Sequence, residues 1–257
     1  MDTSGGAGLA PGVPHDYYRS IATAEQTHWW HAGMLEISRA LLGPRLAAGG
    51  AALDAGCGTG GFLRFLADQG TFASLAGIDI APAAIELARQ SVPGADYRVG
   101  PLRDLPFEDR AFDLAVSNDV FQHVPEADVG ASLRELRRVL AVGGTLLLRT
   151  NGSRRTRRER DDWRAYDSAT LRRELEAAGF IVERITYANL AYSLAAALRG
   201  HTPHAPSEHR HGVPTALPGR LTSALGRRCL SAEARWIGRG GFLPYGHTQF
   251  AVSRSRT

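Results

Sequence analysis

The chain contains no lysine, so arginine supplies all 30 of its strongly basic side chains. The formal net charge at pH 7 is +4, and most of the arginines are interspersed with Asp and Glu. An excess this small permits nucleic-acid binding but does not argue for it. The basic run Arg154–Arg160 is typical of a solvated surface loop, because like charges repel one another and stay hydrated.

Cysteine is scarce as well. With only Cys57 and Cys229, no disulfide framework is implied and a reducing, cytoplasmic location is expected. Long hydrophobic runs are also lacking, since stretches such as 144–148 are far too short to span a bilayer, and no membrane partner is expected. The first residues have neither the basic nor the apolar region of a secretory signal, and we expect residues 1–14 to be a flexible tail.

Helical and strand-like patterns alternate through most of the 257 residues. We expect helices at 17–24, 30–46, from 62, 83–91, 128–140 and 168–178, the last with Ser168 as its N-cap. Strands are expected at 51–54, 74–78, 97–99, 112–116, 145–149, 180–187 and 247–252. This alternation predicts an α/β fold: a Rossmann-like, doubly wound, mostly parallel seven-stranded sheet, with helices on both faces and an antiparallel last strand.

The same patterns predict how one sizeable domain is organised. The segment 189–245 is too long for a plain connection, and its apolar side chains suit a lid over a pocket. The expected parts are a tail at 1–14, an N-terminal helical cover at 15–48, a core at 49–188, the lid insertion at 189–245, and a final strand and tail at 246–257.

A glycine-rich turn, LDAGCGTGG at 53–61, follows the first expected strand. Its glycines satisfy the dinucleotide pattern G-x-G-x-x-G, and Asp79 lies about where a ribose-binding acid belongs. Asp54, however, would repel a pyrophosphate placed on this turn. S-adenosylmethionine instead brings an ammonium and a sulfonium, which a carboxylate can balance while glycines let the backbone approach. The turn therefore favours a cationic nucleoside.

Several stretches resemble the motifs of class I S-adenosylmethionine-dependent methyltransferases, in that family's order, over about 51–150. The first motif is matched by LDAGCGTGG and the second strand by GIDI. The third and fourth strands of the small-molecule branch are matched by YRVGPLRDLPFEDRAFDLAVSNDVFQHV, and the following helix, hairpin and fifth strand by LRELRRVLAVGGTLLL. The flanks EQTHWW and FLPYGHT loosely resemble those of bacterial sugar and natural-product methyltransferases.

This resemblance implies roles for individual residues. The methionine end would be lined by Asp54, Gly56 and Gly58, with Cys57 in the same turn, and the ribose would be held by Asp79. Adenine would pack on Ile80 and meet Leu102 through its backbone, and Asn118 would lie beside the sulfonium.

One position departs from the family pattern. Many members carry an acid where Pro101 stands here, and that acid contacts the adenine amino group. The contact is then lost or replaced, for instance by Arg103 or Asp104.

Methyl transfer needs a general base only when the acceptor is a poor nucleophile while protonated, such as a hydroxyl. His123 is the candidate, although a histidine that packs and hydrogen-bonds to the backbone fits the same position. Asp119 either orients an acceptor or caps a helix.

Aromatic and histidine side chains supply further candidates. Those at 28–31 could cap the crevice, and Trp30 offers a ring face to a sulfonium, although two tryptophans at a helix start also fit a core. Candidate acceptor contacts are Tyr18, His28, Tyr192 and Tyr245. No metal site is expected, because the histidines of HTPHAPSEHRH lie in a proline-interrupted segment.

The sequence therefore predicts a S-adenosylmethionine-dependent methyltransferase acting on a small molecule, with a hydroxyl or amine of a specialised metabolite or sugar as the acceptor. Three alternatives stay open: a nucleic-acid methyltransferase, a nicotinamide oxidoreductase and a non-catalytic cofactor-binding protein. Against the first, SNDV lacks the proline-aromatic motif that holds a flipped base. Nucleic acid is thus not an expected partner, and a homodimer is left open.

Overall fold

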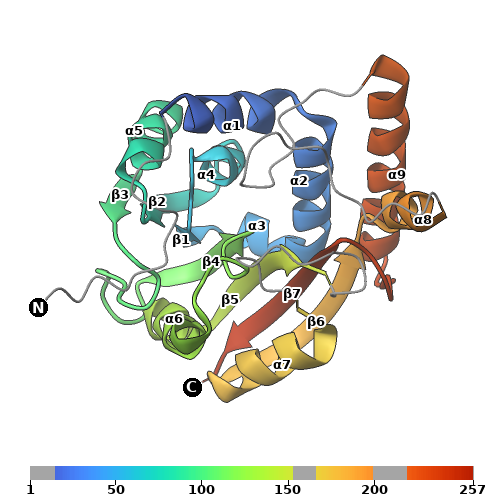
Figure 1. Ribbon diagram of the computed structural model, residues 1–257. Coiled ribbons are helices and arrows are strands. Elements are labelled where there is room, and N and C mark those ends of the chain that lie inside the picture. Colours follow the sequence, from blue (N-terminus) through green and yellow to red (C-terminus); the bar gives the residue numbers. More distant parts are fainter. Residues whose placement is uncertain (1–14, 153–165, 199–218, 257) are drawn as a thin grey trace, which may run out of the picture.

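A computed structural model describes residues 15–152, 166–198 and 219–256 (Figure 1). In this part of the chain the strands are β1 (Gly50–Ala55), β2 (Phe72–Asp79), β3 (Asp96–Val99), β4 (Phe112–Asn118), β5 (Leu140–Asn151), β6 (Phe180–Ala188) and β7 (Thr248–Ser255). The helices are α1 (His15–Thr27), α2 (Trp29–Leu42), α3 (Pro44–Ala48), α4 (Gly61–Ala67), α5 (Pro82–Ser91), α6 (Glu126–Val139), α7 (Ser168–Ala177), α8 (Leu190–Leu198) and α9 (Arg220–Gly238).

The strands form one seven-stranded sheet in the order β3-β2-β1-β4-β5-β7-β6. The neighbours from β3 to β5 are parallel, and β7 runs antiparallel to both β5 and β6. The predicted Rossmann-like sheet with an antiparallel last strand is confirmed. The strand order reverses direction at β1 and β4, which places the topological switch point beside the glycine turn.

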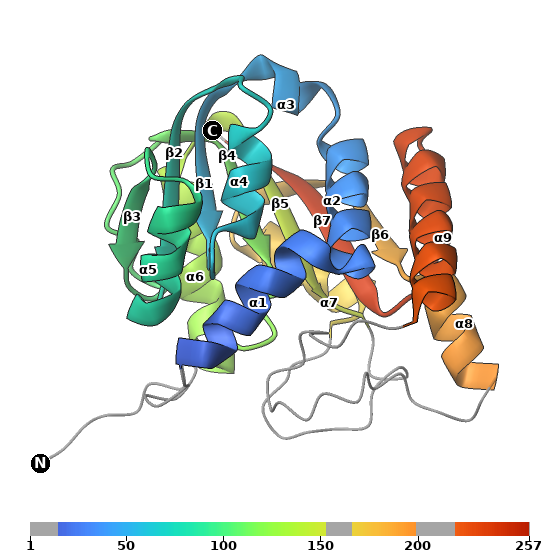
Figure 2. The same cartoon turned by 90° about the horizontal axis from the view of Figure 1, so that it is seen from above.

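Two apolar layers cover the sheet (Figures 1 and 2). One layer packs α6 and α7 on the sheet through side chains such as Leu136 and Leu175. The other packs α2, α4 and α9 on the opposite face through Met34, Leu66 and Leu230. Central strands that are buried on both faces carry near-continuous apolar runs, as Leu146–Leu148 does in β5.

The helix expected at 30–46 is two helices. Gly43, with φ of 50°, ends α2, and Pro44 begins α3 at its first position. Positive φ suits glycine, and proline lacks the N–H that continuation of α2 would need. The expectation of one helix was wrong because the apolar periodicity continues across this break.

Two further helix boundaries differ from expectation. Helix α6 ends at Val139, and Leu140 already pairs with Phe112, so β5 begins before the strand expected at 145–149 and includes Gly143 and Gly144. Helix α7 is capped by Asp167, whose Oδ1 accepts a hydrogen bond from the Thr170 amide at 2.7 Å. Ser168 is not the cap, and its hydroxyl accepts a hydrogen bond from Gln249 instead.

Helix α9, which lies in the C-terminal part of the expected lid insertion, belongs to the core. Gly33 of α2 lies so close to Leu230 of α9 that a Cβ there would be 2.2 Å from a Leu230 methyl carbon. Gly226 of α9 likewise packs against the Trp29 ring. Close helix contact through glycine fixes α9 against α2, as the side-by-side helices in Figure 2 show.

Some expectations fall outside the described residues: the tail at 1–14, the Arg154–Arg160 run and the histidine cluster at 201–211. Across the residues that are described, no helix is long and apolar enough to cross a membrane. Within the same residues, no group of three or more His, Cys, Asp or Glu side chains is arranged to hold a metal ion.

Candidate cofactor and acceptor site

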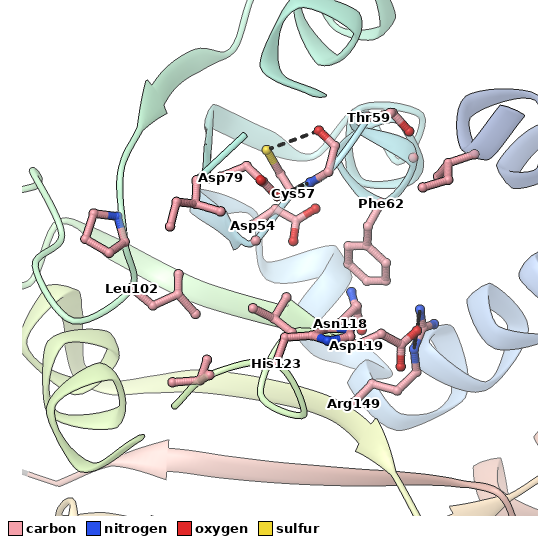
Figure 3. Close-up of a pocket in the computed structure, with 18 of the residues that line it drawn as sticks. Asp54, Cys57, Thr59, Phe62, Asp79, Leu102, Asn118, Asp119, His123 and Arg149 are labelled. Atoms are coloured by element: carbon pink, nitrogen blue, oxygen red, sulfur yellow. Dashed lines mark hydrogen bonds and ion pairs between the residues drawn. The ribbon is translucent and has the colours of Figure 1, made fainter. Parts of the chain in front are cut away.

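A cavity of about 490 Å³ opens at the carboxyl ends of β1, β2 and β4 (Figure 3). Cavities of this size at the switch point of a parallel sheet are the usual ligand sites of such folds. The sequence-predicted residues that line it are Tyr18, Asp54, Gly56, Cys57, Gly58, Asp79, Ile80, Leu102, Asn118, Asp119 and His123. The four that do not line it are His28, Trp30, Tyr192 and Tyr245.

The glycine turn owes its shape to close backbone packing. Gly56 has φ of 84°, and a Cβ there would lie 2.2 Å from a methyl carbon of Val120. The amides of Gly56 and Cys57 both donate to the Ile78 carbonyl, at 2.7 and 3.0 Å. Gly58 has φ of 51°, and a Cβ there would meet open space. The turn thus leaves a bare backbone edge on the cavity.

Asp79 ties the end of β2 to this turn. Its Oδ2 accepts a hydrogen bond from the Gly58 amide and its Oδ1 one from the Ala81 amide, both at 2.9 Å. Burial raises the pKa of Asp79, and these amide hydrogen bonds oppose that rise. The carboxylate is held in one orientation and keeps acceptor capacity toward the cavity.

Asp54 is the most deeply buried acid of the site, with 2% of its surface exposed. Its Oδ1 has no hydrogen-bond partner among the described residues. The pKa of Asp54 is raised to about 8, mainly by burial and also by the nearby Glu25 and Asp79 carboxylates, against an opposing effect of Arg149. A buried carboxylate without a partner is costly, so the site suits a cationic ligand group.

Arg149, at the end of β5, forms a buried ion pair that the sequence reading missed. Its Nη2 and Nε lie 2.7 and 3.0 Å from Oδ2 of Asp119, and the two residues stand together in Figure 3. The guanidinium also lies over the Trp30 ring, 5.2 Å from its centroid. Trp30 therefore supports the cavity wall through Arg149, and its direct contact with the cofactor stays a prediction.

The histidines at the start of α2 have different positions. His28 is buried and caps α2, because its Nδ1 accepts a hydrogen bond from the Trp30 amide at 3.2 Å. His31 lines the cavity, and its Nε2 has no hydrogen-bond partner in the described part of the chain. Burial lowers the pKa of His31 to about 3, helped by Arg149 and His28, so this ring is neutral near pH 7.

The far end of the cavity bears on the adenine contact. Pro101 and Arg103 line this end, whereas Asp104 does not. Arg103 Nη1 lies 3.0 Å from Oδ2 of Asp128, and Asp128 also lines the cavity. The sequence analysis did not include Asp128 among the site residues. It lies on α6, outside the motif of the third strand where the adenine contact was expected.

Two predicted acceptor contacts lie elsewhere. Tyr192 on α8 is 41% exposed, and its ring centroid lies 5.9 Å from that of His247. Tyr245 is half-buried in the segment that leads into β7. Their role in acceptor binding, and that of His28, stays a prediction.

Comparison with known proteins agrees with this geometry. A family model described as a methyltransferase domain matches residues 53–148. The chain is 35% identical over 115 residues to malonyl-[acyl-carrier protein] O-methyltransferase of Serratia marcescens, covering 45% of this chain and 44% of that protein. The corresponding values for the protein of the same name from Pseudescherichia vulneris are 32% over 168 residues, 64% and 62%.

A solved structure has the same fold. Phosphoethanolamine N-methyltransferase 2 of Haemonchus contortus, in complex with S-adenosyl-L-methionine, superposes with a TM-score of 0.61 at 16% identity, covering 95% of this chain and 58% of that one. The chain spans between 44% and 62% of the two sequence relatives, so their activities do not transfer as wholes. Residues 53–148 thus match a methyltransferase domain, and the sheet order and the acidic glycine turn agree with that match.

Proposed function

We propose that this protein transfers the methyl group of S-adenosylmethionine to a small-molecule acceptor. The observation that carries the proposal is the buried, unpaired Asp54 carboxylate, which lines the same cavity as Asp79 and the bare glycine turn. A pyrophosphate would oppose the ionisation of these two acids, whereas a sulfonium nucleoside with an ammonium group favours their carboxylate forms. The matched methyltransferase domain implies S-adenosylmethionine as the cofactor, and the residues that line the cavity fit it.

Cofactor contacts follow from the cavity lining. The methionine end fits Asp54, Gly56, Cys57 and Gly58, with Asn118 beside the sulfonium. Both polar atoms of the Asn118 amide lack partners among the described residues, which leaves them available to a ligand.

The nucleoside end fits the other lining residues. Asp79 would accept from the ribose hydroxyls, and Ile80 and Leu102 would pack on the adenine. Ile80 is 45% exposed although apolar, and a bound base would cover it. Asp128, which lines the cavity beside Arg103, would take the place of the acid that the family often has at the position of Pro101.

When bound, S-adenosylmethionine supplies a methyl carbon that its sulfonium activates for in-line displacement. The protein orients the acceptor and excludes water, which provides much of the acceleration. His123 lines the cavity and would accept the proton of a hydroxyl acceptor. Asp119, fixed by Arg149, would orient that acceptor. The acceptor lone pair forms the new bond to carbon, the carbon–sulfur bond breaks, and S-adenosylhomocysteine and a proton leave.

The acceptor we propose is a hydroxyl or amine of a specialised metabolite or sugar. The two relatives are named for O-methylation, which favours oxygen over nitrogen. The cavity, which Tyr18, His31 and Arg149 also line, joins apolar walls to a few polar groups, as small-molecule pockets do.

The test is a transfer assay with cofactor labelled in its methyl group. The full chain is incubated with panels of alcohols, sugars, amines and acyl thioesters, with RNA as a separate arm, and products are read by mass. Transfer to a small molecule supports the proposal. Transfer to RNA alone, or cofactor binding without transfer to any arm, contradicts it.

A further inference from the structure

We propose that Glu25, on α1, is a cofactor-binding residue that pairs with the α-ammonium group of S-adenosylmethionine. This inference rests on the proposed function and makes the N-terminal helix part of the cofactor site. The motif comparison assigns no role to Glu25, which lies outside the matched residues 53–148.

The first support is the position of Glu25 over the glycine turn. The side chain lines the cavity, and its Oε2 accepts a hydrogen bond from the Thr59 hydroxyl at 2.6 Å. A Cβ on Gly61 would lie 2.6 Å from the Glu25 carboxyl carbon, so the carboxylate fills the space that this glycine leaves. Helix α1 brings Glu25 there with Tyr18 and Ile21 on the same helix face, also lining the cavity.

The second support is the charge balance of this region. Burial raises the pKa of Glu25, while Thr59, Arg149 and the Gly61 amide favour its ionised form. Asp54 faces the same space and is unpaired at Oδ1. The cation beside them, Arg149, is already paired with Asp119. Two acidic side chains therefore face one cavity, and a ligand cation at this point would favour their ionised forms.

The position of Glu25 along the glycine turn favours a contact with the ammonium group over one with the sulfonium. Asp79 accepts a hydrogen bond from the Gly58 amide and is the proposed contact for the ribose. Glu25 instead contacts Thr59 and Gly61, farther along the chain toward α4. A ligand laid along the turn from Asp79 thus meets Glu25 with the amino-acid end of its methionine part.

Helix α1 is anchored independently of this contact. Tyr17 and Tyr18 pack against Ala84 of α5, so α1 lies across the region of α4 and α5 (Figure 2). A substitution at Glu25 is therefore expected to change ligand binding without releasing the helix.

The experiment compares Glu25→Gln with the matched control Glu36→Gln in the full chain. Glu36 lies on α2, accepts a hydrogen bond from Ser231 at 2.6 Å and does not line the cavity. Calorimetry measures the affinities for S-adenosylmethionine, S-adenosylhomocysteine and 5′-methylthioadenosine, which lacks the amino-acid part. Glu25→Gln should weaken the first two by about tenfold and leave the third unchanged. Glu36→Gln should change none.

Each other pattern overturns the inference. Unchanged affinity for the first two ligands removes the contact, loss for S-adenosylmethionine alone assigns Glu25 to the sulfonium, and equal loss for all three indicates general damage. If Glu25→Gln does not fold, Thr59→Val removes the hydroxyl that holds Glu25 and should weaken the same two ligands selectively. Failure of the wild type to bind S-adenosylmethionine would instead overturn the proposed function.

Discussion

At the scale of single residues, Gly56 and Gly58 require glycine for different reasons, backbone conformation in both cases and close packing in one. Both have positive φ, but only Gly56 also has Val120 where a Cβ would be. Gly56→Ala is expected to lower the free energy of unfolding by about 3 kcal/mol, from strain and overpacking together. Gly58→Ala should cost about 1 kcal/mol from strain alone. Urea unfolding of the two variants checks this, and equal losses would mean that the Val120 contact relaxes freely.

Asp119 shows how a candidate catalytic residue can also have a structural role. The Asp119 carboxylate pairs with Arg149, whose side chain is 9% exposed. The backbone of Asp119 has φ of 57°. Asp119→Ala leaves this guanidinium buried and unpaired, and should destabilise the protein by about 2–3 kcal/mol. Thermal unfolding measures the loss, with His123→Ala as the comparison. A variant that keeps its melting temperature but loses transfer would assign Asp119 to the acceptor alone.

At the scale of secondary-structure elements, α9 acts as a core helix. Leu230 is 2% exposed against α2, whereas Leu225 on the same helix is 65% exposed. Leu230→Ala is expected to lower the free energy of unfolding by about 2–5 kcal/mol, and Leu225→Ala to change it by less than about 0.5 kcal/mol. Denaturant titration compares them. If both variants change the free energy of unfolding by similarly small amounts, α9 is not a core helix and the predicted lid role stands instead.

Elements and their order were predictable because apolar periodicity and turn residues are local signals. Asp54 and Asp79 followed from the same local patterns, since Asp54 lies one residue before the end of β1 and Asp79 ends β2. Glu25 and Arg149 did not, because Glu25 meets Thr59 from 34 residues away and Arg149 depends on the register of β5 against β4. A bulge between Phe112 and Leu114 shifts that register, and no local pattern of the sequence marks it.

At the scale of the whole molecule, the buried acids make stability and binding depend on pH in opposite directions. The pKa of Asp54 is raised from 3.8 to about 8 in the folded protein. Its protonated form therefore contributes stability that is fully present below about pH 4 and lost as pH rises through about 8. A cationic cofactor favours the carboxylate, so its affinity should rise with pH up to about 8.

Two measurements check this linkage. The melting temperature of the ligand-free wild type should fall between pH 5 and 8 more than that of Asp54→Asn, which has no group to titrate there. Calorimetry at pH 7 in buffers of different ionisation enthalpy should show proton release on binding by the wild type. Parallel melting profiles, or proton uptake on binding, would contradict the assignment of Asp54.

The central claim is that the acidic glycine turn holds a sulfonium nucleoside, and calorimetric titration of the full chain tests it most directly. S-adenosylmethionine should bind at one site per chain, with affinity reduced at least about tenfold by Asp79→Ala, while NADH gives no binding heat. Binding of NADH with no response to S-adenosylmethionine would contradict the account.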